Sequence, residues 1–379
     1  MTSKERMAVA MRMGIPDRVP IMGQMSIGHM LLQTGFPPVE FWLSRERFAE
    51  GLLRLRRRYA FDGILVSLHG HTPDWERGIV RIVRDADREV VHWKDGGRTV
   101  FQRDDLPLHY PAADRVPPSI ASFDPDSIPE RLDFIPVSQG LRFAIDPEHP
   151  YDIFRTVQAE SGEDYSIHGE VTSPFDYFLD LFGFSAGFLA LVEEPDRSKA
   201  VLERLTAGVV RIAEEQARLG LDAIKISSPY AGAGFISPRH YREFVLPYER
   251  RIARSGRELG VPVYLHTCGA IHDRLELMAE AGVSGIECLD PPPLGNVELA
   301  EAKVRVGRTL FIKGNIDPVH TLLAGPPERI EADVRRRLAV GGAGGGYILS
   351  PACSIAPHTP PGHIEILPRL AAETAHPAG

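Results

Sequence analysis

His266 and Cys268 are the residues whose types and spacing point most directly to chemistry. They lie in the stretch VYLHTCGAIHDRL, where an apolar run ends, and a single threonine separates them. Imidazole and thiolate are ligands that Zn²⁺ favours, and residues two apart in extended backbone project to the same side. The pair alone is equally compatible with a redox role or with inert burial, because free cysteine often behaves as a small buried hydrophobe.

Cys353, far downstream, supplies a third side chain of the same kind. A catalytic zinc site has three protein ligands and leaves one coordination position open, so we predict a metal site made by His266, Cys268 and Cys353. We interpret Cys288, within GIECLD, as a packing residue, because strand alternation places it on the opposite face from Glu287. His272, on the helix expected to follow Cys268, is an alternative ligand.

Short apolar strands alternate with amphipathic helical stretches along the chain, which is typical of parallel βα units. We expect eight strands, which cover residues 18–25, 61–68, 165–171, 222–227, 262–266, 283–289, 310–314 and 346–350. The pattern predicts an α/β protein, a (β/α)8 TIM barrel. We treat residues 1–379 as a single domain, with one insertion.

The insertion covers about residues 79–141, after the second expected strand. Period-two alternation around KDGGRT predicts an antiparallel ribbon with a tight turn. Long ordered insertions on barrels often form lids or partner surfaces, although a loop without function is an equal alternative.

Barrel enzymes carry their chemistry at the carboxyl ends of the strands. Glu170, Asp290 and Asn315 lie at three such ends, and we predict catalytic or positioning roles for them, with Glu170 as a fourth zinc ligand or a proton acceptor. The residues that we expect to line the substrate pocket are His69, His71, Tyr230 and His358. A scaffold role that uses only hydrogen bonds is the alternative for each carboxylate or amide.

The composition excludes several classes of protein. A net charge of −8 argues against a general nucleic-acid binder, and no apolar run approaches the length of a membrane span. Three cysteines are too few for a disulfide framework, and the amino-terminal stretch lacks the apolar core of a signal peptide. We therefore expect a cytoplasmic protein, and a homodimer is compatible with the sequence.

Five ordered motifs give the chain a family resemblance that covers nearly its whole length. It resembles the uroporphyrinogen decarboxylase superfamily in SKERMAVAMRMGIPDRVPI, GLDAIKISSPYAGAGFISPRHYREFVLPYERRI, VPVYLHTCG, FIKGNIDP and GYILSPACSIAPHTPPGHI. The resemblance implies a distorted (β/α)8 barrel, in agreement with the eight strands expected above.

Departures from the decarboxylase pattern favour another branch of this superfamily. The stretch VPIMGQMSIGHM lacks the arginines that the resemblance would require for an acidic porphyrinogen, ILVSLHGH lacks the essential aspartate, and Cys353 stands where the decarboxylases carry histidine. His-x-Cys with a distant Cys is similar to the zinc-dependent, corrinoid-linked methyltransferases of the methylcobalamin:coenzyme M type.

This branch implies Zn²⁺ as a cofactor and a methyl group that moves between a small molecule and a corrinoid. The chain has no D-x-H-x-x-G cobalamin-binding motif, so we expect the corrinoid on a separate protein or free. Only six of the 43 basic residues are lysine, a bias typical of high-GC bacterial genomes, and we therefore favour a methoxylated or methylated donor over coenzyme M. A tetrapyrrole decarboxylase and a non-catalytic tetrapyrrole- or corrinoid-binding protein are the alternatives.

Overall fold

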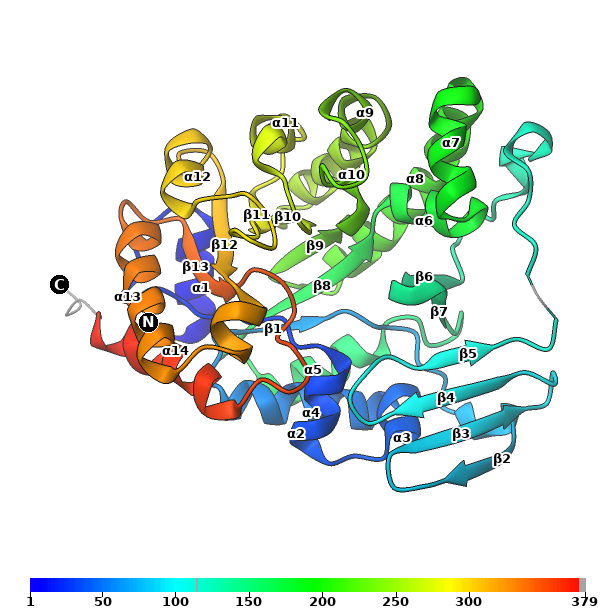
Figure 1. Ribbon diagram of the computed structural model, residues 1–379, viewed down its shortest axis with the longest axis horizontal. Coiled ribbons are helices and arrows are strands. Elements are labelled where there is room, and N and C mark those ends of the chain that lie inside the picture. Colours follow the sequence, from blue (N-terminus) through cyan, green and yellow to red (C-terminus); the bar gives the residue numbers. More distant parts are fainter. Residues whose placement is uncertain (114, 375–379) are drawn as a thin grey trace.

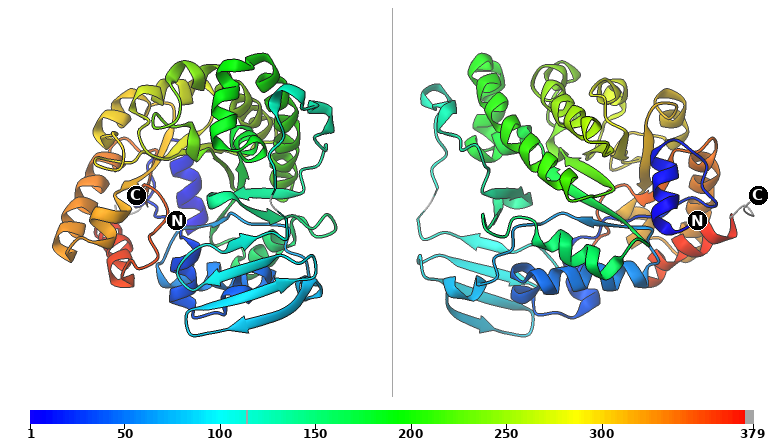
Figure 2. Two further views of the ribbon diagram at one scale, coloured as in Figure 1. Left: turned by 45° about the vertical axis from the view of Figure 1, so that its right-hand side comes forward. Right: turned by 180° about the vertical axis from the view of Figure 1, so that it is seen from behind.

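A curled sheet of parallel strands forms the centre of the molecule in this computed structural model, which describes residues 1–113 and 115–374. Among these residues, seven strands form the sheet in the order β1-β8-β9-β10-β11-β12-β13. Their bounds are β1 Gly63–Val66, β8 Ser166–Thr172, β9 Ala223–Ser227, β10 Val263–Thr267, β11 Gly285–Cys288, β12 Phe311–Ile316 and β13 Tyr347–Pro351. Figure 1 and Figure 2 show the sheet curling into an incomplete barrel with helices around its outer face. The predicted TIM-like α/β class is confirmed.

Helices connect and cover these strands. They are α1 Ser3–Met11, α2 Ile27–Thr34, α3 Pro38–Leu43, α4 Arg45–Arg58, α5 Asp152–Ser161, α6 Pro174–Phe182, α7 Phe184–Glu193, α8 Pro195–Arg218, α9 Pro238–Phe244, α10 Leu246–Glu258, α11 Leu275–Glu280, α12 Leu299–Arg305, α13 Pro327–Gly342 and α14 Pro361–Glu373. Several begin with proline at the first turn, where the missing N–H costs no helical hydrogen bond. In the described part of the chain no single helix is long and apolar enough to cross a membrane; the bent pair α6 and α7 passes that test jointly, on length and composition alone.

The first expected strand, residues 18–25, is a correction. The segment forms only isolated parallel bridges, from Ile21 to Leu349 and from Met25 to Ile355. Pro20 has no N–H to donate to a ladder and Gly23 weakens one, which accounts for the missing regular strand. The segment nevertheless lies between the two outermost strands, because the N–H of Met22 bonds to Leu349 and that of Asp62, just before β1, bonds to Ile21.

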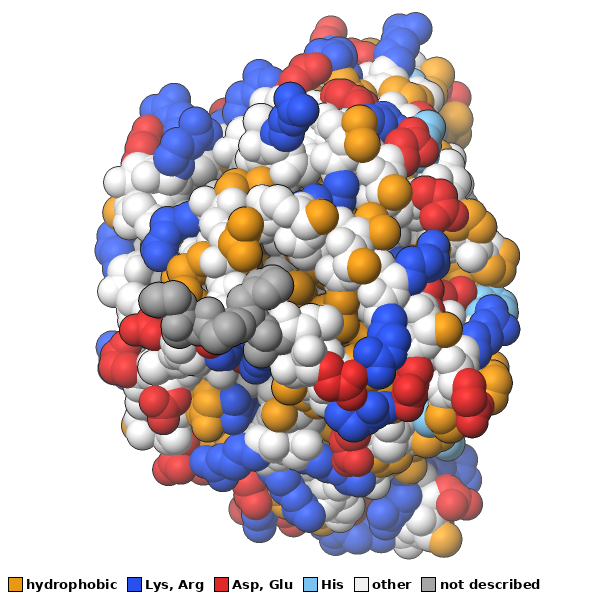
Figure 3. All heavy atoms as spheres, turned by 90° about the vertical axis from the view of Figure 1, so that its left-hand side faces the viewer, with side chains coloured by type: hydrophobic (Ala, Val, Ile, Leu, Met, Phe, Trp, Pro, Cys, Tyr) orange, Lys and Arg blue, Asp and Glu red, His pale blue; other side chains and the backbone are white. Residues whose placement is uncertain are grey.

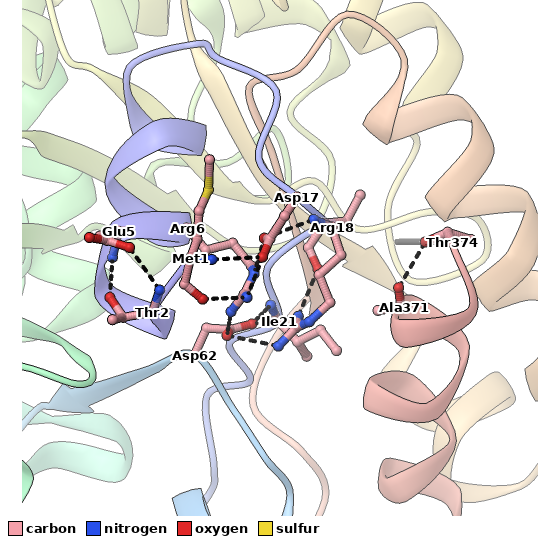
Figure 4. A network of polar contacts seen from close by, with 11 residues as sticks. Met1, Thr2, Glu5, Arg6, Asp17, Arg18, Ile21, Asp62, Ala371 and Thr374 are labelled. Atoms are coloured by element: carbon pink, nitrogen blue, oxygen red, sulfur yellow. Dashed lines mark hydrogen bonds and ion pairs between the residues drawn. The ribbon is translucent and has the colours of Figure 1, made fainter. Parts of the chain in front are cut away.

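A buried ion network fixes this segment in place (Figure 4). The Asp62 carboxylate is fully buried and accepts hydrogen bonds from the guanidinium groups of Arg6 and Arg18 and from the N–H of Ile21. Asp17 also binds Arg6, at 2.6 Å and 2.9 Å. The hydrogen bond from that guanidinium, the largest influence on the Asp17 carboxyl, holds its pKa well below its usual range.

Helix α1 closes the amino end of the barrel. Its residues Met7, Ala10 and Met11 are buried in one cluster with inward-facing side chains of five strands, namely Leu65, Ala223, Tyr264, Phe311 and Ile348. Because alternate residues of a strand point to opposite faces, the next inward-facing positions lie further toward the carboxyl end. That end remains available for a site.

The insertion folds as a four-stranded antiparallel sheet in the order β2-β3-β4-β5. Its strands are β2 Ile79–Arg84, β3 Arg88–Trp93, β4 Arg98–Gln102 and β5 Leu108–Tyr110, and the hairpin β6 Phe134–Val137 and β7 Leu141–Ala144 follows. The predicted ribbon with a turn at KDGG is confirmed, with Gly96 at φ 90°.

The sheet lies on the opposite side of the molecule from α13 and α14 (Figure 1). Figure 3 shows basic and acidic side chains interspersed on the α13 side.

Candidate metal centre

His266, Cys268 and Cys353 converge at the carboxyl end of the barrel. Their ligand atoms all lie within 4.8 Å of one another. The Nε2 of His266 is 3.2 Å from the Sγ of Cys268, and that sulfur is 3.8 Å from the Sγ of Cys353. His266 is the penultimate residue of the buried strand β10, and Cys353 lies two residues after β13. Three side chains of metal-ligand type, remote in sequence, therefore meet at one point.

The register of the sheet surrounds His266 with charged residues. His266 pairs with Glu287 on β11, which pairs with Lys313 on β12, so the three face the barrel interior side by side. The Nδ1 of His266 is 3.0 Å from the Glu287 carboxylate, which also accepts from the Lys313 ammonium. Although burial opposes it, the Lys313 charge holds the pKa of Glu287 well below its usual range. The carboxylate thus fixes the imidazole with Nε2 toward the cysteines.

The cluster stabilises negative charge on the sulfur of Cys353, whereas the pKa values of the Cys268 and Cys288 thiols are raised. The hydrogen bonds of the Cys268 and Cys288 thiols are the largest influences on Cys353 and lower its pKa well below the usual range. Burial alone would lower the pKa of His266, but the negative charge of Cys268 and the hydrogen bonds around the ring raise it well above the usual value. A metal ion in this position would displace protons from these groups.

Cys288 does not lie on the opposite face from Glu287, which is a correction. It interacts with the thiols of Cys268 and Cys353, and its own thiol donates to the Asp290 carboxylate at 3.1 Å. Cys288 and Leu289 adopt positive φ values of 84° and 55°, a conformation that breaks the alternation on which the prediction rested. It is fully buried and is not one of the three clustered ligands.

Asp290 and Asn315 lie in the scaffold around the cluster. Asp290 accepts from the N–H of Gly269 at 2.7 Å, which anchors the turn directly after Cys268. The fully buried Asn315 donates to the carbonyls of Leu289 and Val297 and accepts from Arg337 on α13. Its amide therefore points away from the cluster and into the helix layer.

A cavity of about 450 Å³ lies beside the cluster. Glu170, Tyr230 and Asp176 line it, together with Ser354, the neighbour of Cys353. Glu170 is not part of the metal-type cluster; its carboxylate forms an ion pair with Lys225, a fully buried residue, at 2.9 Å. Glu170 and Tyr230 thus occupy positions where they can contact a small molecule.

Asp176 is a candidate that sequence reasoning missed. It is buried, and burial raises the pKa of its carboxyl to about 8, so at neutral pH it is mostly a neutral hydrogen-bond donor. Ser173 is the N-cap of α6, and the N–H of Asp176 donates to its hydroxyl. In the sequence, Ser-x-x-Asp at a helix start indicates only a capping motif, which conceals the role of a carboxyl that faces a cavity.

The remaining predicted residues lie further from the cluster. The Nδ1–H of His69 donates to the Pro150 carbonyl at 3.0 Å, and the ring packs against Tyr151 and Phe154. His69 does not line the cavity beside the cluster. His71 lines a second cavity instead. His358 is exposed and pairs with Asp104 of the insertion at 3.1 Å. His272 pairs with Glu301 at the surface.

The family model of uroporphyrinogen decarboxylase (URO-D) matches residues 137–374. The chain belongs to the uroporphyrinogen decarboxylase family. Methylcobamide:CoM methyltransferase MtaA of Methanosarcina barkeri is 28% identical over 216 residues, which cover 57% of this chain and 60% of the relative. Uroporphyrinogen decarboxylase of Edwardsiella ictaluri is 32% identical over 232 residues, 58% of this chain and 63% of the relative.

One solved structure shares the whole fold. A methyltransferase from Methanosarcina mazei covers 98% of this chain and 99% of its own, with a TM-score of 0.73 and 19% sequence identity, which shows the fold alone. The chain spans about 60% of the length of the curated relatives named above. The relatives named above include both a methyltransferase and a decarboxylase. The residues of the site therefore have to indicate which of the two activities this chain has.

Proposed function

We propose that the protein is a zinc-dependent methyltransferase that moves a methyl group between a small molecule and a corrinoid carried on a separate protein. The observation that supports this most is the convergence of the His266 nitrogen and the Cys268 and Cys353 sulfurs within 4.8 Å. The relatives named as methylcobamide:CoM methyltransferases add support. A cytoplasmic location and the reading of residues 1–379 as one domain remain part of the proposal.

The residues present fit a zinc ion. One imidazole and two thiolates form a donor set that zinc favours, and three protein ligands leave the fourth position open for a reactant. Cys268 and Cys353 are only partly buried, and Ser354 at the cavity wall follows Cys353 directly. When bound, zinc would either hold a thiol as its thiolate or act as a Lewis acid on a methoxy oxygen.

The residues around the cluster have separable roles in this proposal. Glu287 holds the Nδ1 side of His266 and so keeps Nε2 directed at the cysteines. Asp290 positions the turn after Cys268 through the Gly269 N–H. In the cavity, Glu170 accepts protons or binds a polar group of the reactant while Lys225 keeps it oriented. Asp176 offers a hydrogen-bond donor, because its carboxyl is mostly protonated at neutral pH.

We favour a methoxylated or methylated small molecule as the donor and the corrinoid protein as the acceptor. The cavity has room for a small reactant, at about 450 Å³, and the neighbour of Cys353, Ser354, lines it. Tyr230 supplies an aromatic wall there, in edge contact with Phe184 at 4.6 Å between ring centroids. His358 is not among the residues that line the cavity, although its neighbour Pro357 is. Its contact with Asp104 joins the insertion to the segment after Cys353.

A tetrapyrrole decarboxylase is the alternative within the family, supported by the relatives of that name. Its substrate is polyanionic, so the enzyme would need free cationic groups near the mouth of the barrel. Arg18, the arginine next to the segment 19–25, is instead bound to Asp62 at the amino end. Arg115 and Arg142 beside the cavities share the carboxylate of Asp180, which leaves one positive charge for a substrate that carries several negative ones. A non-catalytic tetrapyrrole- or corrinoid-binding protein would have no need of a three-ligand metal cluster.

An anaerobic assay with free cob(I)alamin tests the proposal. The protein, loaded with zinc, is mixed with a panel of methoxylated small molecules, and the conversion of cob(I)alamin to methylcobalamin is followed by its absorbance. We expect conversion with at least one donor, and loss of conversion in Cys353→Ser. The absence of any spectral change across the panel, or full activity in Cys353→Ser, would contradict the proposal.

A further inference from the structure

A second and larger cavity lies between the inserted sheet and the barrel. Its volume is about 1040 Å³, which is at the upper end of the size of small-molecule sites. Strands β3, β4 and β5 form one wall, and the segments after β1 and around β7 form the other. The proposed function does not use this cavity.

All three tryptophans of the chain line this cavity. They are Trp42, Trp75 and Trp93, and they come from α3, from the 3-10 turn Trp75–Gly78 and from β3. Further aromatic lining residues are Phe101, Tyr110 and Phe143. Trp42 and Phe143 meet edge to face, with 5.6 Å between ring centroids. Such walls favour a flat aromatic ligand, because aromatic rings pair in stacked or edge-to-face geometry.

Positive charge exceeds negative charge where this cavity meets the smaller one. Arg115 and Arg142 both line the larger cavity, and both bind the single carboxylate of Asp180. The Nε of Arg142 is buried and has no hydrogen-bond partner within residues 1–113 and 115–374. Two guanidinium groups that share one carboxylate leave one positive charge available for an anion, and planar guanidinium groups match a carboxylate.

The acidic residues of the cavity wall are already engaged. Asp95 accepts from the N–H of Gly97 at 2.8 Å, and Asp146 accepts from the N–H of Glu148 at 2.9 Å. His71, also in the wall, packs against Phe48 and Phe143. Burial lowers its pKa to about 3, so the ring is neutral and adds no charge. These hydrogen bonds leave the carboxylate charges in place, and Asp95, Asp146 and Asp180 together balance Lys94, Arg115 and Arg142. The site that favours an anion is therefore confined to the end of the cavity where Arg115 and Arg142 share one carboxylate.

The two cavities adjoin. Trp42, Arg115 and Gly140 line both of them, so a molecule in the larger cavity lies next to the space beside the metal-type cluster. We infer that the larger cavity binds a planar aromatic carboxylate, with the ring among the tryptophans and the acid group at Arg142 and Arg115. This inference rests on the proposed function in one respect, because it names aromatic acids as the class of small-molecule reactant.

The test uses 4-methoxybenzoate as the probe. Because every tryptophan lines the cavity, intrinsic tryptophan fluorescence reports occupancy directly, and isothermal titration calorimetry provides an independent affinity. We expect a saturable change in fluorescence with wild type. The affinity should fall about tenfold or more in Arg142→Gln and in Trp75→Ala, and it should be unchanged in Arg81→Gln, an exposed charge on β2 outside the lining residues.

Two matched ligands measure separately what the aromatic ring and the carboxylate contribute to the binding affinity. The neutral 4-methoxybenzyl alcohol lacks the carboxylate, and trans-4-methoxycyclohexanecarboxylate lacks the flat ring; both should bind at least tenfold more weakly than 4-methoxybenzoate. The inference is overturned if wild type shows neither a saturable fluorescence change nor binding heat. It is also overturned if Arg142→Gln and Trp75→Ala, both folded by circular dichroism, bind as tightly as wild type.

The same titration on Cys353→Ser separates this inference from the proposed function. Cys353 does not line the larger cavity, so the variant should bind 4-methoxybenzoate with wild-type affinity even after it loses zinc. Binding without zinc or methyl transfer in wild type would contradict the proposed function and leave the cavity assignment standing. Methyl transfer without binding of the aromatic acid would contradict the cavity assignment and leave the proposed function standing.

Discussion

Glu287 is the residue on which the orientation of the metal-type cluster depends most. Glu287→Gln keeps the volume of the side chain but removes the charge that binds His266, Lys313 and Lys225. We expect zinc affinity to fall about 10- to 100-fold, the usual effect of losing a partner of a ligating histidine. Competition with a chromogenic chelator measures this. Cys288→Ala, a buried neighbour outside the three ligands, is the control and should keep its zinc; equal affinities in wild type and Glu287→Gln would contradict the assignment.

The raised pKa of Asp176 predicts how the free energy of unfolding depends on pH. Its pKa is raised from 3.8 to about 8 in the folded protein, so between these pH values the native state holds a proton that the unfolded state has released. The free energy of unfolding therefore decreases as pH rises through this window, with a slope of up to about 1.4 kcal/mol per pH unit. Asp176→Asn, which is always neutral, should lose this slope and gain stability relative to wild type from pH 5 to pH 8.

Urea unfolding of both proteins at pH 5, 6.5 and 8 measures the difference. Burial also raises the pKa of Glu249, to about 7. Both proteins carry this residue, and its negative charge is itself one of the causes that raise the pKa of Asp176. A difference in unfolding free energy that stays constant across the three pH values would show that Asp176 is ionised in the folded state.

The residue scale also shows what sequence can and cannot predict. The sequence predicts His266, Cys268 and Cys353 because few chemistries use those residue types together. A charged residue inside each of the apolar strands AIKIS, GIEC and FIKGNI is the signal that points to Lys225, Glu287 and Lys313. The face of Cys288 could not be predicted, because it depends on positive φ values at two non-glycine residues.

At the scale of elements, the ion network around Asp62 holds the irregular first segment between β13 and β1. Asp62→Ala leaves Arg6 and Arg18 without their shared buried partner, and removal of one member of a buried pair costs about 3–5 kcal/mol. Urea unfolding measures this loss. Glu258→Gln breaks the exposed pair with Arg254 and should cost well under about 1 kcal/mol. Similar losses in the two variants would mean that the network does not secure the segment.

Helix α2 and the insertion touch at a point where only glycine fits. A Cβ on Gly28 would lie 2.0 Å from the carbonyl oxygen of Asp104, so Gly28→Ala should displace the insertion, lower the melting temperature and increase proteolysis within residues 79–110. Gly362 on α14 has open space at the same atom, and Gly362→Ala should gain up to about 1 kcal/mol from helix propensity. Differential scanning fluorimetry and limited trypsin digestion compare them; an unaffected insertion in Gly28→Ala would contradict the contact.

Most elements follow from the sequence pattern because buried parallel strands are continuous apolar runs. The expected strands at 262–266 and 346–350 appear as β10 and β13 with small shifts at their ends. Residues 18–25 have the apolar composition of a strand, but their pairing depends on Pro20 and on β13, which is more than 300 residues away. Local pattern carries no information on that contact.

At the scale of the whole molecule, the apolar core under α1 and the metal-type cluster lie at opposite ends of the barrel. Helix α1 fills the amino end with apolar side chains. The buried side chains of Lys225, Glu287 and Lys313 come next along the strands. The metal-type cluster and its adjoining cavities occupy the carboxyl end. The sequence predicts this polarity through the position of ligand-type residues after the strands. It does not predict that the insertion folds back to create the larger cavity, because that depends on the packing of β3–β5 against segments from elsewhere in the chain.

The zinc content of the purified protein tests the central claim most directly. Inductively coupled plasma mass spectrometry should find about one zinc per chain in wild type and in Cys288→Ala. His266→Ala, Cys268→Ser and Cys353→Ser should each lose most of it, while circular dichroism shows that they remain folded. A well-folded wild-type protein without stoichiometric metal, or three ligand variants that retain it, would contradict the assignment of a zinc-dependent methyltransferase.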